Sequence, residues 1–280
     1  ASLELYQASA LVHDDIIDKA DERRGMPTPH RTLAHHHASS SWIGSSTDFG
    51  RHAAILVGDF LFSAATAAAD EQALTLREDC ARAFARRFAD MHAEVALGQY
   101  LDITAEQTTL DPQRTDALST SDSLEVALHK SAHYSVVHPA ILGAICGAST
   151  FDGVAELLAV LETILTPWGL AFQLRDDDLG VFGDPTVTGK PAGDDLREGK
   201  RTALLALTWE ASSPAERRAL TDVLGVVEAS AEQIATATDI VARNGRAAHE
   251  AEIARLVADG EAALEAATFD EDARAMLREL

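Results

Sequence analysis

The stretch ASALVHDDIIDKADERRG, residues 8–25, places carboxylates directly after an apolar run. In a helix, residues four apart share a face, so Asp14 and Asp18 project together, with Asp15 beside them. Like charges at this spacing cost roughly 0.2–0.5 kcal/mol per pair. From these residues alone, a solvated acidic face and a cation site are about equally good interpretations.

A second cluster, in AFQLRDDDLGVFGD, interrupts a segment that otherwise has the pattern of a protein core. Asp176, Asp177 and Asp178 are adjacent, and ionised carboxylates near a core are costly without a counter-cation. Carboxylates on facing helices of a bundle can share Mg²⁺, which takes oxygen ligands and keeps positions for water and phosphate. The two clusters therefore predict Mg²⁺ and a diphosphate substrate.

Basic side chains follow both clusters, as a diphosphate would require. Arg23 and Arg24 lie one turn past the first aspartates, next to a glycine that lets the backbone bend. Lys190 and Lys200 lie in a Gly-rich segment after the second cluster and are placed to close over phosphates. Lys130, in LHKSAHYS, is a further candidate.

The elements that position these residues are predicted to be helices, because Ala, Leu, Glu and Arg dominate long tracts and aromatic residues are few. One helix is expected over residues 1–22, and the nearly apolar stretch AAILVGDFLFSAATAAAD is expected to be buried on all sides. Pro139 and Pro167 should kink two helices. Loops are expected at residues 38–50 and 183–200. Further helices are predicted over about residues 75–106, 122–149, 153–182, 201–225 and 229–267.

The charge balance limits the possible partners. The formal net charge is −22, from 45 Asp and Glu against 23 Lys and Arg, so nucleic acid and anionic membrane are poor partners. Cys80 and Cys146 have no metal-type spacing and predict free, inert thiols in a cytoplasmic protein. No transmembrane segment is expected. Because the sequence begins within an amphipathic pattern and without Met, we expect N-terminal helices to be missing.

In its motifs the sequence resembles the trans-isoprenyl diphosphate synthases, the polyprenyl synthetase family. The likeness extends over residues 4–205, and within the family it is greatest to the short- and medium-chain geranylgeranyl diphosphate synthases. The matching positions are Asp14, Asp15 and Asp18 with Arg23, Arg24, Gly25 and His30; Lys130 and Ser131; Phe172, Gln173, Asp176 and Asp177; and Gly189, Lys190, Pro191, Gly193, Asp195, Leu196, Gly199, Lys200, Arg201 and Thr202.

The resemblance implies an all-α fold, a bundle of long helices around a central cavity, forming one domain over residues 1–280. It implies a Mg²⁺-dependent head-to-tail condensation of isopentenyl diphosphate with an allylic diphosphate, which would be dimethylallyl, geranyl or farnesyl diphosphate. It further implies three Mg²⁺ ions with the bound diphosphate, a homodimer and a cytoplasmic location.

Residue roles follow from the same resemblance. Asp14, Asp18 and Asp176 would be Mg²⁺ ligands, supported by Asp15 and Asp177. The allylic diphosphate would be bound by Arg23, Lys130, Lys190 and Lys200, and isopentenyl diphosphate by Arg24. Gln173 would either touch substrate or fix the second acid cluster.

Two departures from the family pattern stand out. The second motif usually ends in Asp, but Gly180 occupies that position here, so an outer carboxylate is absent. The Gly-Gly-Lys-Arg motif that binds isopentenyl diphosphate would fall before residue 1, and we expect it to be missing from the given sequence rather than from the protein.

Product length can be argued from the first helix. The growing chain would run from Asp14 back along this helix, where Ser9 and Ala10 are small and Tyr6, one turn deeper, is bulky. One helical turn rises about 5.4 Å, close to one extended isoprene unit. A floor at Tyr6 favours a medium-length product, with twenty carbons preferred.

Other histidines and other functions agree less well with the sequence. Three consecutive residues point in different directions on a helix, so we expect surface positions for His35, His36 and His37. We expect His13 to support the metal site or to pack against its neighbours rather than act as a base. A class I terpene cyclase would need an Asn/Ser/Glu metal motif, which the sequence lacks. A non-catalytic or modulatory subunit of a heteromeric synthase would not need the aspartates and lysines together.

Overall fold

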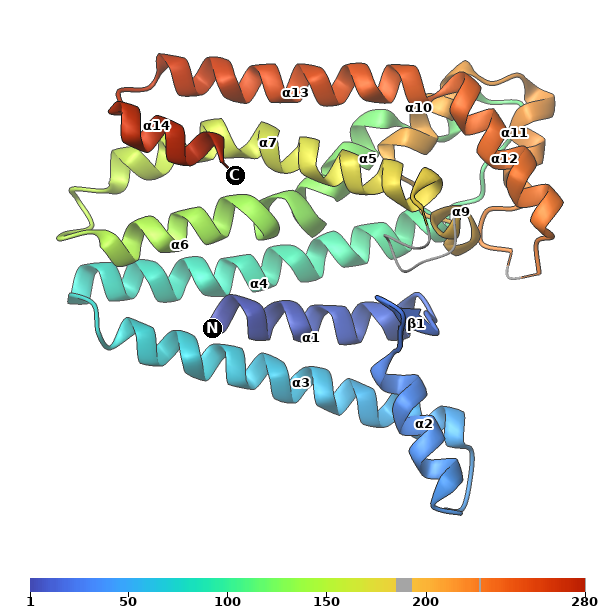
Figure 1. Ribbon diagram of the computed structural model, residues 1–280, viewed down its shortest axis with the longest axis horizontal. Coiled ribbons are helices and arrows are strands. Elements are labelled where there is room, and N and C mark those ends of the chain that lie inside the picture. The colour runs from blue at the N-terminus through green and yellow to red at the C-terminus, as the bar shows by residue number, and fades with distance from the viewer. Residues whose placement is uncertain (185–192, 227, 280) are drawn as a thin grey trace. The chain divides into compact units, whose positions relative to one another are not determined.

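The chain is almost entirely helical in a computed structural model that describes residues 1–184, 193–226 and 228–279 (Figure 1). The predicted all-α class is confirmed. Among the described residues, strands are confined to a hairpin of β1 (Glu22–Arg23) and β2 (Met26–Pro27), in which Glu22 pairs with Pro27. This hairpin turns the chain directly after the first aspartates.

The chain divides into two compact units. The first comprises Ala1–Ala85 with Gly183–Ala192, and the second comprises Arg86–Phe182 with Gly193–Leu280. Helix α4 begins in the first unit and ends in the second. The helices up to α4 are α1 (Ser2–Ile17), α2 (Pro29–Ser39), α3 (Ser46–Ala73) and α4 (Glu78–Gln107).

In the first unit, α3 packs along both α1 and α2. The Ser9 hydroxyl donates a 2.8 Å hydrogen bond to the Gly58 carbonyl, and the Tyr6 ring lies edge-on to Phe62, with centroids 6.2 Å apart. The expectation that α3 is buried on all sides is wrong, because Leu56 is 67% exposed and Phe60 is 72% exposed. Small residues such as Gly58 bring α1 close on one side only.

The other helices of the described residues lie in the second unit. They are the 3₁₀ turn η1 (Thr115–Ala117), α5 (Thr120–Ala127), the π-helix η2 (Leu128–Val137), α6 (His138–Gly147), α7 (Ala155–Phe182), α9 (Asp194–Glu198), α10 (Ala203–Ala211), α11 (Pro214–Thr221), α12 (Ala231–Asn244), α13 (Arg246–Ala266) and α14 (Glu271–Arg278). Helices α7 and α13 lie side by side, and α7 also packs against η2 (Figure 1). These contacts fix the helix that carries the second aspartate cluster.

Several predicted helices are divided in the structure. The predicted helix over 122–149 becomes α5, η2 and α6, because Pro139 lacks the amide hydrogen that a continuous α-helix would need. The predicted helix over 201–225 breaks at Ser213, which caps α11 in a capping box with Glu216. The one over 229–267 breaks at Gly245, where an added Cβ would lie 2.0 Å from Thr208 Oγ1.

A large buried cluster of the second unit surrounds Trp209 of α10. The Trp209 side chain is fully buried, and its Nε1 donates a hydrogen bond to the Arg114 carbonyl at 2.9 Å. Leucines, isoleucines and valines of α10 to α12 complete the cluster. Burial of each such side chain contributes roughly 1.5–3 kcal/mol, which makes this end of the unit a rigid support for α9 and the segment that follows it.

Two helices, α3 and α7, are long and apolar enough to cross a membrane by length and composition alone. This is weak evidence, because core helices of soluble proteins pass the same test. It does not contradict the expectation that the chain has no transmembrane segment.

Candidate active site

The first aspartate cluster lies at the carboxyl end of α1 and is neutralised in part by an arginine from the hairpin. Arg23 Nε donates to Asp15 Oδ1 at 2.7 Å, and Arg23 Nη2 donates to Asp14 Oδ2 at 3.1 Å. Burial of Asp15 raises the pKa of its carboxyl, and Arg23 only partly offsets this. Burial alone would lower the pKa of Arg23, but Asp15, Asp14 and Asp18 together raise it. The predicted grouping of acids with Arg23 is therefore present within one unit.

The residues around this cluster are positioned by the end of α1 and by the hairpin turn. Asp18 is the C-terminal cap of α1, and its amide donates to the Asp14 carbonyl. Arg24 has a positive φ of 53° and an exposed side chain, and Gly25 follows at φ 72°. The turn thus directs Arg23 and Arg24 differently, as separate roles would require. His30 is buried, and its ring lies 3.2 Å from the Thr28 hydroxyl.

The second cluster lies near the carboxyl end of α7, where Asp176 is exposed and Asp177 is buried. Gln173, one turn earlier, donates from Nε2 to Asp177 Oδ1 at 2.8 Å, so within this structure Gln173 holds the acid cluster. Burial raises the pKa of Asp177 to about 8, with contributions from the charges of Asp195, Asp176 and Asp102.

The third adjacent aspartate has a different partner. Arg246, the first residue of α13, makes a two-pronged contact to Asp178, with Nε at 2.9 Å and Nη2 at 3.0 Å from its two carboxylate oxygens. Asp178 therefore joins α7 to α13 and needs no metal ion as counter-cation. The sequence gives no local signal for this pair, because Asp178 and Arg246 are 68 residues apart.

The position of Gly180 is explained by Asp195 of α9. A Cβ built on Gly180 would lie 1.9 Å from Asp195 Oδ2 and 2.4 Å from its Cγ. The Asp195 carboxylate thus occupies the space that an aspartate at position 180 would need. Position 180 therefore carries no carboxylate of its own, and the acid beside it is Asp195 of α9.

The candidate lysines differ in their surroundings. Lys130, in η2, donates from Nζ to Asp102 Oδ2 of α4 at 2.5 Å. Lys200 lies 3.4 Å from Glu198 Oε2. Lys190 lies outside the described residues. Asp102 contributes to the raised pKa of Asp177, so Lys130 also belongs to the surroundings of the second cluster.

The donor set fits Mg²⁺. Four carboxylates, those of Asp102, Asp176, Asp177 and Asp195, interact electrostatically in the second unit, and Asp177 is shifted to a pKa of about 8 by burial and by the other three. A cluster of this kind favours a hard cation, which prefers oxygen ligands. Asp14, Asp15 and Asp18 present a second oxygen-rich group in the first unit.

Comparison with known proteins agrees with these motifs. A family profile described as "Polyprenyl synthetase" matches residues 1–241.

The chain belongs to the polyprenyl synthetase family.

Among its relatives in this family, the geranylfarnesyl diphosphate synthase of Aeropyrum pernix is 33% identical over 247 residues, which are 88% of this chain and 67% of that protein. The geranylgeranyl diphosphate synthase of Mycobacterium tuberculosis is 33% identical over 257 residues, 89% of this chain and 63% of that protein. The chain thus spans about two thirds of the length of the curated polyprenyl synthetases it matches.

A solved structure gives the same result for the fold. The geranylgeranyl pyrophosphate synthase of Corynebacterium glutamicum, complexed with isoprenyl diphosphate and magnesium, is 38% identical, with a TM-score of 0.88. The match covers 99% of this chain and 75% of that one. The all-α polyprenyl synthetase fold is therefore established for this chain.

Some minor expectations of the sequence analysis need correction. His35 and His36 are exposed as expected, but His37 is buried: its Nε2 lies 3.2 Å from the Ile43 carbonyl, and its ring packs on Trp42 and Phe49. Helix α2, which carries these histidines, was not predicted. A Pro at its first position, preceded by Thr28 at the N-cap, was the available signal.

Proposed function

We propose that this polyprenyl synthetase is a prenyltransferase that catalyses the Mg²⁺-dependent head-to-tail condensation of isopentenyl diphosphate with an allylic diphosphate. The observation that carries the proposal is the composition of the second cluster. Buried Asp177 is held by Gln173 among other carboxylates, with Lys130 close by on η2. A protein that only modulated a partner would have no need of this arrangement.

Each side chain has a defined task in this proposal. Asp14, Asp18 and Asp176 hold Mg²⁺, Asp15 fixes Arg23, and Gln173 fixes Asp177. Arg23, Lys130, Lys190 and Lys200 bind oxygens of the allylic diphosphate, and Arg24 binds isopentenyl diphosphate. Bound Mg²⁺, three ions in the family pattern, would supply positive charge that stabilises the diphosphate as a leaving group.

The carbon chemistry then needs few protein groups. Ionisation of the allylic C–O bond leaves a carbocation, the double bond of isopentenyl diphosphate attacks it, and the released diphosphate removes the proton. Cationic side chains, Arg23 and Lys130 among them, retain the released diphosphate until the proton has been transferred.

The favoured product is geranylgeranyl diphosphate, with twenty carbons. Tyr6 is buried and its ring is held by Phe62, so the bulky side chain that we assign to the floor is fixed in place. The Ser9 hydroxyl is turned toward the Gly58 carbonyl of α3, and Ala10 lies on the same turn of α1.

The deciding experiment incubates the full chain with labelled isopentenyl diphosphate and farnesyl diphosphate, with and without Mg²⁺, and resolves the products by length. Asp176→Asn should abolish product, whereas Asp116→Asn, at an exposed aspartate paired with Arg114, should not. A twenty-carbon product supports both the reaction and the Tyr6 floor. Longer products would support the proposed reaction but contradict the assignment of Tyr6 as the floor.

A binding measurement covers the case in which no product forms. Calorimetry with an unreactive allylic thiolodiphosphate should show binding that requires Mg²⁺ and is weakened by Asp14→Asn and Asp176→Asn. Absence of both product and binding would contradict the proposal and make a modulatory subunit the better hypothesis.

We further propose a cytoplasmic homodimer. Leu56 and Phe60, on the exposed side of α3, support an apolar contact with a second copy. Light scattering should give twice the mass of the chain, and Leu56→Glu with Phe60→Glu should reduce it to that of a monomer. An unchanged mass would remove α3 from the interface.

A further inference from the structure

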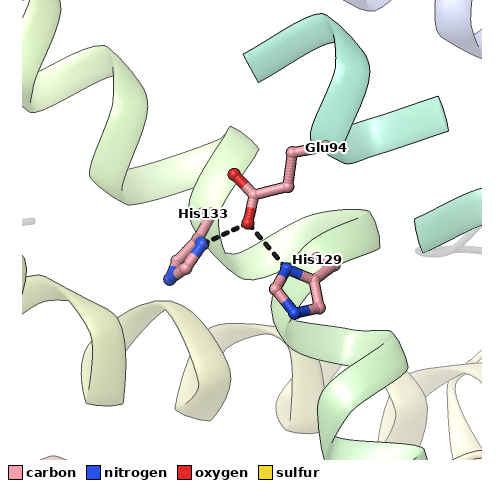
Figure 2. Close-up of side chains that lie close together, drawn as sticks. All are labelled: Glu94, His129 and His133. Atoms are coloured by element: carbon pink, nitrogen blue, oxygen red, sulfur yellow. Dashed lines mark hydrogen bonds and ion pairs between the residues drawn. The ribbon is translucent and has the colours of Figure 1, made fainter. Parts of the chain in front are cut away.

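Three histidines converge on one glutamate in the second unit, apart from the aspartate clusters. Glu94 comes from α4, His129 and His133 from the π-helix η2, and His138 is the first residue of α6 (Figure 2 shows the first three). Glu94 Oε1 lies 2.7 Å from His129 Nδ1 and 2.6 Å from His133 Nδ1. Both imidazole rings therefore direct the same nitrogen toward one carboxylate oxygen.

The ligand atoms of Glu94, His129 and His133 all lie within 4.8 Å of one another. Bonds from Zn²⁺ to imidazole nitrogen and carboxylate oxygen are about 2.0–2.2 Å long, which places tetrahedral ligand atoms roughly 3.3 Å apart. The short contacts to Glu94 Oε1 thus need to open by less than 1 Å, which small side-chain rotations achieve. Two imidazoles and one carboxylate are a usual set of three protein ligands that leaves a position open.

His138 completes the arrangement from behind the carboxylate. Its Nε2 lies 2.7 Å from the second oxygen of Glu94, and its side chain is only 3% exposed. The His138 Nδ1 is buried and has no hydrogen-bond partner. A hydrogen bond to the outer oxygen of a ligating carboxylate fixes that ligand's direction. His138 is therefore a positioning residue for Glu94.

The state of Glu94 suits a ligand. Burial would raise the pKa of its carboxyl, but hydrogen bonds from His133, His138 and His129 together lower the pKa well below its usual range. The carboxylate is ionised and accepts on both oxygens. Metal binding at Nδ1 of His129 and His133 would displace the protons there, leaving each neutral imidazole with its proton on Nε2. Mixed nitrogen and oxygen donors favour Zn²⁺, Co²⁺ or Ni²⁺ over Mg²⁺, which prefers oxygen.

We propose that Glu94, His129 and His133, with Glu94 oriented by His138, bind one divalent transition-metal ion of the Zn²⁺ class. The ion would link α4 to η2, since its ligands come from both elements. The site is separate from the proposed diphosphate site in donor chemistry, and the proposal does not depend on the prenyltransferase activity.

The test is calorimetric titration of the full, chelator-treated chain with Zn²⁺ alone, in a buffer with excess Mg²⁺ to occupy the aspartates. One Zn²⁺ per chain is expected. His129→Gln and His133→Gln should each weaken binding at least about a hundredfold, and the positioning variant His138→Gln about 10–100-fold. The double variant His35→Gln with His36→Gln, at the exposed histidines of α2, is the control and should bind as the original chain does.

Two readouts keep the test decisive. If a variant fails to fold, the long-range proton–nitrogen NMR spectrum of the unchanged chain still reports the site, because Zn²⁺ should move the ring nitrogen signals of two histidines. Zn²⁺ should also raise the unfolding temperature of the unchanged chain but not of His133→Gln. The proposal would be overturned if Zn²⁺ moved no ring nitrogen signals, or if His133→Gln bound Zn²⁺ as tightly as the original chain. Loss of Zn²⁺ binding in the α2 control or in Asp176→Asn would also overturn it.

Discussion

At the scale of single residues, the close approach of Asp195 to Gly180 shows how one acidic cluster is assembled from two helices. The glycine on α7 leaves the space that the carboxylate of α9 fills. A side chain at position 180 and the present conformation of Asp195 exclude each other. The effect of a substitution at residue 180 therefore depends on the side chain at residue 195.

Gly180→Ala should displace the Asp195 carboxylate, because the new Cβ would lie 1.9 Å from Oδ2. We expect the Mg²⁺ concentration for half-maximal activity to rise about tenfold, since removal of a group that supports a metal ligand costs 10–100-fold. Steady-state kinetics over a Mg²⁺ series measures this. Gly147→Ala, where a Cβ meets no atom within 4 Å, is the control.

Asp195→Asn should have a similar effect, and the double variant should be no worse than Asp195→Asn alone, because both changes remove one interaction. Effects that simply add would show that Gly180 and Asp195 act independently, contrary to the geometry.

At the scale of elements, one face of α4 holds the π-helix through three positions spaced four residues apart. Glu94 contacts His129 and His133, Gly98 lies against the η2 backbone, and Asp102 pairs with Lys130. Positions four apart share a helix face, so the three contacts form one continuous line. The location of Lys130 therefore depends on how closely η2 approaches α4.

Gly98→Ala should disturb this approach, because its Cβ would lie 2.4 Å from the Lys130 amide nitrogen and 2.6 Å from the His129 carbonyl carbon. Backbone atoms cannot rotate away, so we expect a loss of about 1–3 kcal/mol in the free energy of unfolding, as for other overpacked positions. The affinity for an allylic diphosphate should fall as well. Urea denaturation and calorimetry measure the two effects.

Gly143→Ala on α6 is the matched control, because a Cβ there meets nothing within 4 Å. It should leave affinity unchanged and stabilise the chain slightly, since alanine restricts the unfolded chain more than glycine does. Equal stability of Gly98→Ala and Gly143→Ala would contradict the close packing of α4 and η2.

His249 links α13 to α7 and should make stability depend on pH. It is fully buried, its Nε2 lies 2.7 Å from the Leu174 carbonyl, and burial lowers its pKa despite that hydrogen bond and the charge of Asp178. Its pKa in the unfolded chain is about 6.5. The unfolded state therefore binds more protons below this pH, and stability should decline as pH falls from about 7 through 6.5.

Urea denaturation between pH 5 and pH 8 tests this effect. His249→Gln keeps a donor for the Leu174 carbonyl but does not titrate, so the decline toward acid should be shallower. The exposed His52, changed in the same way, is the control. An identical decline in the original chain and in His249→Gln would exclude His249 as its source.

At the scale of the whole molecule, the excess of acids over bases should destabilise the folded chain through self-repulsion. The formal net charge is −22, and the Debye length shortens from about 30 Å at 0.01 M salt to about 8 Å at 0.15 M. We expect the unfolding temperature to rise by several degrees between these salt concentrations in NaCl, measured by calorimetry. A fall would show that attractive ion pairs outweigh the repulsion.

The extent to which the molecule could be predicted follows from which interactions are local. The aspartate clusters, Arg23 and Gln173 were found because each acts within a few residues of its partner. The pairing of Asp178 with Arg246 could not be found in this way, because it depends on the packing of α13 on α7.

Helix class was predictable from composition, and the helices predicted over 75–106 and 153–182 lie close to α4 and α7. The division of the other predicted helices was not predictable. The break at Gly245 and the place of Asp195 beside Gly180 follow from close approaches between segments distant in sequence. The spacing of His129 and His133, four residues apart, was a local signal for the shared glutamate, yet the glutamate itself lies more than thirty residues earlier.

The contact of Arg23 with Asp14 and Asp15 has a consequence for how the protein is made. Because the guanidinium already balances much of the charge at the end of α1, this helix can reach its place while the polypeptide is still being synthesised, before any metal has been delivered. Supply of the ion and completion of the first unit are thereby uncoupled in time. On the proposed function, a shortage of magnesium would then limit activity without preventing the first unit from forming.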